Sequence, residues 1–185
     1  MLDVKVKGLS ELLKYLDQVP VNIERNIVRA GLLAGAKVIA TEAKAIVRRE
    51  AYQTGALEDS IRPVTFGKYR RGELRGLPVA VIAAGGKVRN IPGRKTAYYA
   101  MMVENGTRPH VIRSKKRGGT LSLFNRRVKQ VNHPGMQGIR FMARAGDTKQ
   151  RAALDAFAAR VAYRLEKYGI EVPDNISSLE YENEG

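Results

Sequence analysis

Apolar and polar residues near the start of the chain follow patterns that predict two short elements. Residues 2–7 alternate between the two classes, which is typical of a strand, and Gly8 ends the pattern. The leucines from Leu9 to Leu16 then recur at intervals of three and four residues, the spacing of an amphipathic helix. Because proline does not continue a helix, we expect this one to end before Pro20.

Two longer helical patterns follow. The first spans about residues 21–49, and its middle, Ala30 to Ala36, is rich in Gly and Ala, so that a sheet or a second helix can approach it closely. The second spans about residues 148–168 and ends at Gly169, a residue type favoured just after a helix. The apolar face of the first helix is formed by Ile23, Ile27, Ala30, Ala34, Val38 and Ala45.

Short runs of β-branched residues lie between the two long helices. Residues 61–66 and 77–84 predict a hairpin whose connection carries a basic tip, here called the basic arm. Residues 97–103 fit a helix or a strand equally well. Three further short strands are predicted at Val111–Lys115, Thr120–Phe124 and Val128–Val131.

This order of elements predicts an α+β fold. We expect the long N-terminal helix and the C-terminal helix to pack on one face of a mostly antiparallel sheet, with a basic β-hairpin arm. Residues 1–170 are predicted to form a single α+β domain. Residues 171–185 are acidic and lack an apolar pattern, so they are predicted to be a disordered tail.

The composition narrows the class of protein. The chain has no Cys, which excludes disulfides and thiolate metal sites. No N-terminal stretch has the regions of a signal peptide. The longest stretch without a charged residue, Gly76 to Gly86, is 11 residues and too short for a membrane span. We therefore expect a soluble protein that does not contact a membrane.

The net charge of +15 is unevenly distributed. Five acids and no Lys or Arg follow Ile170, so residues 1–170 carry +20, and ten Lys or Arg but no acid lie between Asn105 and Gly146. Repulsion on this scale favours contact with a polyanion or an acidic partner over a merely solubilising surface. The two parts of the predicted contact surface are Lys68, Arg70, Arg71 and Arg75 in the basic arm, and Arg113, Lys115, Lys116, Arg117, Arg126, Arg127 and Lys129, here called the basic run.

No pattern of residues predicts catalysis. The only histidines, His110 and His133, have no acid nearby in sequence with which to form a metal site. No serine lies in a strand–turn–helix context, and no paired glycines lead into a phosphate loop. The sequence therefore predicts a protein that is not an enzyme and has no cofactor or metal. With 6% aromatic residues and no Trp, any contact with nucleic acid would be with phosphates, without sequence preference.

Two segments, residues 97–116 and 131–145, together resemble a tailed-phage family, the minor tail or tail-completion (head–tail joining) proteins typified by gene product ten of phage HK ninety-seven. An earlier block after the long Ala-rich helix fits the same family, and Arg144 stands where the family often has a proline. The residues that carry the resemblance are Thr54, Gly55, Leu57, Tyr99, Glu104, Gly106, Thr107, His133, Pro134, Gly135 and Phe141.

The resemblance implies a structural virion protein of a bacteriophage or prophage, located at the head–tail junction or tail and in the host cytoplasm before assembly. It implies a homo-oligomer, a ring at the neck or upper tail through which DNA passes. The implied neighbours are head-closure or connector proteins and tail-terminator or tail-tube proteins, with non-specific contact to packaged DNA. The alternative that the charge leaves open is a cytosolic nucleic-acid-binding protein without sequence preference.

Overall fold

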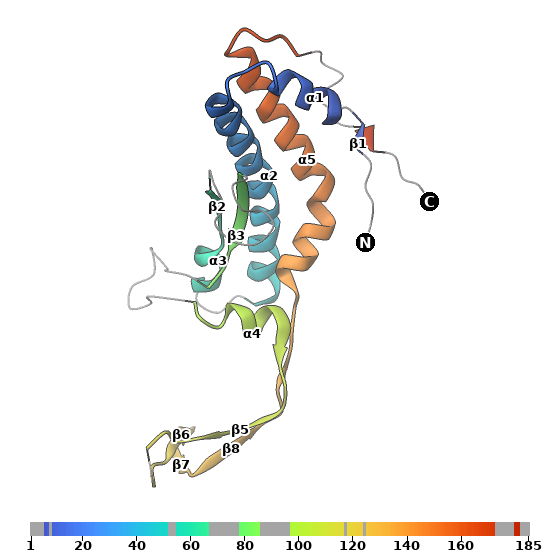
Figure 1. Ribbon diagram of the computed structural model, residues 1–185. Helices are drawn as coiled ribbons and strands as arrows, with labels where there is room; N and C mark the ends of the chain where they lie inside the picture. The colour runs from blue at the N-terminus through green and yellow to red at the C-terminus, as the bar shows by residue number, and fades with distance from the viewer. Residues whose placement is uncertain are drawn as a thin grey trace. The chain divides into compact units, whose positions relative to one another are not determined.

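The computed structural model describes residues 6–7, 9–51, 55–66, 78–85, 97–116, 118–123, 125–172 and 180–181. They form two compact units (Figure 1). The first, here called the helical unit, comprises Met1–Ala97 and Phe141–Gly185; the second, the strand unit, comprises Tyr98–Arg140. The sequence predicted one domain over residues 1–170 and did not anticipate this division.

Three helices form the frame of the helical unit: α1 (Leu9–Leu16), α2 (Val21–Glu50) and α5 (Phe141–Glu166). The long helices α2 and α5 lie side by side (Figure 1). They run in opposite directions, because Gly31 of α2 contacts Val161 whereas Glu50, at the other end of α2, binds Arg144.

The small residues of α2 allow the close approach of α5. A Cβ atom at Gly31 would lie 2.8 Å from the Phe157 ring, and one at Gly35 would lie 2.7 Å from the Ala153 carbonyl oxygen. Neither distance leaves room for a side chain. The Gly- and Ala-rich middle predicted for this helix is therefore a helix-packing surface.

A continuous apolar core joins the three helices at the end where α2 begins. It includes Val172, so the first residues after α5 turn back onto the helices. The large side chains are fully enclosed, with Leu12, Ile27 and Leu165 each at most 1% exposed. The buried members of this core are Leu12, Leu16, Ile27, Ala158, Val161, Ala162, Leu165 and Val172.

A short helix and a hairpin cover another side of α2. The helix α3 (Ala56–Ser60) leads into β2 (Arg62–Phe66), which pairs with β3 (Val79–Ala83). Ser60 fixes this junction, because its buried hydroxyl donates to the Leu57 carbonyl at 2.7 Å and accepts from the Gly85 N–H at 3.0 Å. The predicted hairpin is confirmed, while its connection, the basic arm, lies outside the described residues.

The two ends of the chain meet in one further strand pair. Strand β1 (Val6–Lys7) pairs antiparallel with β10 (Glu180–Tyr181). The acidic tail was predicted to be disordered, but these two residues of it form backbone hydrogen bonds with the N-terminal strand. An alternating pattern cannot be seen in a strand of two residues, which explains why β10 was not predicted.

The strand unit is a nested series of antiparallel pairs that follows a short helix. Helix α4 comprises Ala100–Asn105. The pairs β4–β9, β5–β8 and β6–β7 then make up a long two-stranded ribbon (Figure 1). The strands are β4 (Gly106–Thr107), β5 (His110–Arg113), β6 (Leu121–Leu123), β7 (Arg126–Val128), β8 (Gln130–His133) and β9 (Met136–Gln137).

The α+β class and the two long helices are confirmed, with two differences in detail. The described strands form five separate two-stranded pairs and not one sheet; α2 packs on the β2–β3 pair, and α5 packs on α2. Helix α5 begins at Phe141, seven residues before the predicted start at Thr148. Thr148 resembles a helix cap in sequence, but its hydroxyl donates to the Arg144 carbonyl within the helix.

Candidate functional site

The basic run is gathered on the ribbon of the strand unit. Six of its seven predicted residues are described, and all six side chains are exposed. They lie on β5, on β7 and in the turns beside them: Arg113, Lys115, Lys116, Arg126, Arg127 and Lys129. Arg117 and the basic-arm residues Lys68, Arg70, Arg71 and Arg75 lie outside the described residues.

The strand register places the cations on both faces of the ribbon. Residues opposite each other in an antiparallel pair point to the same face, and successive residues point to opposite faces. Arg126 is opposite Leu123, whereas its neighbour Arg127 is opposite Ser122 and therefore points to the other face. The ribbon thus has no single basic face, and positive charge surrounds it.

Apolar side chains of the ribbon are also left in solvent. Val111 is 48% exposed, Ile112 is 38% exposed and Leu123 is 40% exposed. Among the described residues of the strand unit, only Ala100 is buried. An isolated two-stranded ribbon is marginally stable in water at best. Within the described part of the strand unit, this ribbon therefore consists of paired strands whose apolar side chains are left largely in solvent.

Close backbone contacts hold the root of the ribbon. The Ile139 N–H donates to the Val103 carbonyl at 2.9 Å, and the Arg140 N–H donates to the Glu104 carbonyl at 3.1 Å. Gly106 has φ +78, and a Cβ there would lie 2.4 Å from the Met136 carbonyl oxygen. This motif position therefore requires glycine, because any side chain would be strained there. Glu104 contributes through its backbone, a role that its side-chain type could not reveal.

The two histidines meet across the strand pair β5–β8. Their rings stack with centroids 5.0 Å apart and planes at 27°. His110 Nδ1 lies 2.8 Å from the Arg108 carbonyl, and the Gly135 N–H donates to His133 Nδ1 at 3.0 Å. Within the part of the chain that is described, no group of three or more His, Cys, Asp or Glu side chains could hold a metal ion. The two histidines lie opposite each other because of the register between β5 and β8, and this register could not be predicted from the sequence.

The other motif residues have mostly structural positions. Gly135, at φ +88, turns the chain between β8 and β9. Leu57 and Phe141 are 2% and 1% exposed, within the helical unit. Tyr99 is half-buried and makes an edge-to-face contact with Tyr98 at 5.9 Å between ring centroids.

The remaining motif residues lie at other points of the fold. Gly55 has φ +71 and precedes α3, and Thr107 pairs with Met136. Pro134 is exposed just after β8, and Thr54 lies outside the described residues.

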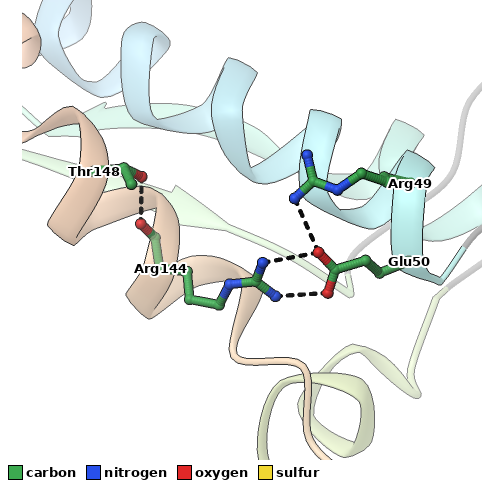
Figure 2. A network of polar contacts seen from close by, with 4 residues as sticks. All are labelled: Arg49, Glu50, Arg144 and Thr148. Atoms are coloured by element: carbon green, nitrogen blue, oxygen red, sulfur yellow. Dashed lines mark hydrogen bonds and ion pairs between the residues drawn. The ribbon is translucent and has the colours of Figure 1, made fainter.

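Acids and bases of α2 and α5 are paired at one end of the helix pair. Arg144 binds both carboxylate oxygens of Glu50, at 2.6 and 2.8 Å, and Arg49 donates to the same carboxylate at 2.9 Å (Figure 2). These hydrogen bonds lower the pKa of Glu50 to about 2. Farther along the helices, Lys149 lies 3.5 Å from Glu42.

Toward the other end of the helix pair, several cations of α2 and α5 form no ion pair with a described residue. A hollow of about 660 Å³, here called the cationic hollow, lies between α2, β2 and the carboxyl-terminal end of α5. Nearby, the pKa of the Tyr163 phenol is lowered because Lys167 donates a hydrogen bond to it, and the charges of Arg160 and Arg164 act in the same direction. The polar residues that line the hollow are Asn26, Arg29, Lys37, Thr65, Arg160, Arg164 and Tyr168.

The cationic hollow could not be predicted from the amino-acid sequence. The spacing of four residues between Arg160 and Arg164 is a signal for one helix face, but Arg29 and Lys37 come from a helix that lies more than a hundred residues earlier. Their convergence depends on how α2 and α5 pack.

Comparisons with protein-family models, with curated protein sequences and with solved structures give no match to this chain. The described helices include none that is both long and apolar enough to cross a membrane.

Proposed function

We propose that this chain is a structural virion protein of a tailed bacteriophage or prophage that acts in head–tail joining or tail completion. The observation that carries this proposal is the ribbon of the strand unit, a cationic pair of strands whose apolar side chains remain exposed. Such a ribbon gains stability when a partner covers it. The motif resemblance to the tail-completion family suggests where that partner is found.

The partner surface would belong first to further copies of the same chain. In a ring, each ribbon would lie against a neighbouring copy, which would cover residues such as Ile112 and Leu123. Head-closure or connector proteins and tail-terminator or tail-tube proteins would contact the remaining surfaces. Function would then follow from assembly, without a catalytic residue, in the virion after assembly in the host cytoplasm.

The charge distribution supports a role beside DNA. Because cations point to both faces of the ribbon, one face can meet an acidic neighbour while the other meets packaged DNA. Contact with phosphates alone carries no sequence information, which suits a channel through which any sequence passes.

One measurement on assembly tests the proposal. Replacing Arg126 and Arg127 by Glu should abolish infectious particles in a phage complemented with the variant, because an acid then replaces a cation on each face of the ribbon. The matched control is Lys14→Glu with Arg25→Glu, which changes the net charge equally at exposed positions of α1 and α2. Normal particle yield from the ribbon variant, with its circular dichroism spectrum unchanged, would contradict the proposal.

The second candidate is a cytosolic nucleic-acid-binding protein without sequence preference, favoured by the six exposed cations of the basic run. It predicts that the isolated monomer binds duplex DNA with a steep dependence on salt. The virion proposal predicts weak binding by the monomer and formation of oligomers with its own copies or neck proteins. Sedimentation of the purified chain, with and without DNA, distinguishes the two.

A further inference from the structure

We propose that the cationic hollow of the helical unit is a binding site for phosphate groups. The site is separate from the basic run and does not depend on the proposed virion role. The argument rests on which residues line the hollow, how their charges are balanced and how one of them is hydrogen-bonded.

The hollow brings together four cations from two helices. Arg29 and Lys37 lie two turns apart on α2, and Arg160 and Arg164 lie one turn apart on α5. Asn26, Thr65 and Tyr168 add neutral groups that can donate hydrogen bonds. The volume of about 660 Å³ leaves ample room for an oxyanion between these groups.

No carboxylate balances these charges in the part of the chain that is described. None of the residues lining the hollow is acidic, and none of the four cations forms an ion pair with a described residue. The same two helices pair Glu42 with Lys149 and Glu50 with Arg144 toward their other end. Four like charges in one hollow repel each other, and a bound anion removes that repulsion.

Arg164 gives a second, independent observation. Its Nε is buried and has no hydrogen-bond partner, which is rare for a buried donor. The guanidinium therefore has an unused N–H on the edge that binds oxyanions in a bidentate manner. A small rotation of the side chain toward a bound oxyanion would satisfy this donor.

The electrostatics of the α5 terminus explain only part of the cluster. Cations in the last turns of a helix interact favourably with its carbonyl end, which accounts for Arg164 and Lys167. This effect does not extend to Arg29 and Lys37, which lie in a different helix and far from its last turn. A ligand that all four cations face explains the whole cluster.

Phosphate is the oxyanion that fits this cluster best. Three guanidinium groups supply planar pairs of N–H donors that match its oxygens, and the hollow's four positive charges suit an anion of charge two or more. A backbone phosphate of DNA and a free compound such as pyrophosphate offer the same chemistry. The experiment therefore uses both.

Calorimetry on the full chain tests the site with pyrophosphate and, separately, with a short DNA duplex. Arg160→Gln combined with Arg164→Gln should weaken pyrophosphate binding by about tenfold or more, because charged hydrogen bonds are lost. The control Arg25→Gln removes an exposed cation of α2 that does not line the hollow, and should bind as the wild type does. Arg29→Gln, at an exposed position, provides a second variant if the double variant fails to fold.

The DNA titration identifies the source of the phosphate. If the site binds DNA, the variants should lower duplex affinity and reduce its salt dependence by about one for each lost phosphate contact. If the variants lose affinity for pyrophosphate but bind duplex DNA as the wild type does, the ligand is a free phosphate compound. Absence of binding of both ligands to the wild type, or equal affinity in wild type and variants, would overturn the proposal. Neither result bears on the ribbon and virion assembly.

Discussion

Large apolar side chains form a buried core in the helical unit, but many are exposed in the strand unit. In the helical unit, Leu12, Ile27 and Leu165 are at most 1% exposed, in a core formed by elements of the same unit. In the strand unit, Val111 and Ile112 lie in paired strands and are 48% and 38% exposed. The first unit obtains its stability from its own packing, whereas the second leaves apolar side chains in solvent, where the partner that we propose would cover them.

This difference predicts that substitutions in the two units have different effects. Substitutions in the helical unit should change the free energy of unfolding, because they act on a closely packed interior. Substitutions on the ribbon should change association and leave folding nearly untouched. Three predictions examine this separation in order of decreasing effect.

The largest expected effect compares the same substitution in the two units. Ile27→Ala should destabilise the protein by about 3 kcal/mol, because it leaves a cavity in the core beside α1 and α5. Ile112→Ala should cost less than about 0.5 kcal/mol, since that side chain is already in solvent. Urea unfolding followed by circular dichroism measures both. Equal losses would show that the two isoleucines are packed alike and would remove the distinction between the units.

A smaller effect is expected from adding one methyl group to helix glycines. Gly35→Ala should cost about 1–2 kcal/mol, because the new Cβ meets the Ala153 carbonyl oxygen at 2.7 Å. Gly146→Ala is the matched control in α5; nothing lies within 4 Å of its Cβ, so the better helix former should stabilise by about 0.5–1 kcal/mol. Thermal unfolding shows whether each substitution lowers or raises the stability. If Gly35→Ala also raises the melting temperature, close helix contact is not what requires glycine there.

The smallest effect concerns the exposed ion pair of Figure 2. Since folding lowers the pKa of Glu50 from 4.5 to about 2, the pair contributes stability above pH 4.5 and loses it as the pH falls toward 2. Glu50→Gln should therefore reduce the wild type's loss of stability across this range, and Arg144→Gln should give the same profile. Because the pair is exposed, both changes should be minor at neutral pH. If the acid unfolding curve of either variant is as steep as that of the wild type, the ion pair is not the source of this pH dependence.

The sequence allowed much of the fold to be predicted because the helical unit obeys simple periodicities. The long helix α2, the hairpin of β2 and β3 and the helix α1 all follow from apolar spacing. The start of α5 could not be predicted in this way, because Gly146 and Thr148 inside the helix are residue types common at helix ends. The division into two units escaped prediction because strands with exposed faces have no apolar pattern to show which layer they join.

The candidate sites were predictable to different degrees. The basic run is contiguous in sequence, so its position on one ribbon followed from local pairing. The role of Gly106 followed from the residue type, since only glycine tolerates that backbone conformation readily. The cationic hollow depends on contacts between helices far apart in the chain, which neither spacing nor residue type encodes.

The backbone bonds at the root of the ribbon have a consequence for the rate of folding. The contact between Glu50 and Arg144 joins residues 94 positions apart, and the whole strand unit lies within that loop. Hairpins form within microseconds, so the bonds from Ile139 and Arg140 to Val103 and Glu104 can close before α5 docks on α2. Once these bonds have formed, fewer residues of free chain separate α2 from α5. The loss of conformational entropy when the two helices dock is then smaller. A segment that contributes almost nothing to the core would in this way speed the formation of that core.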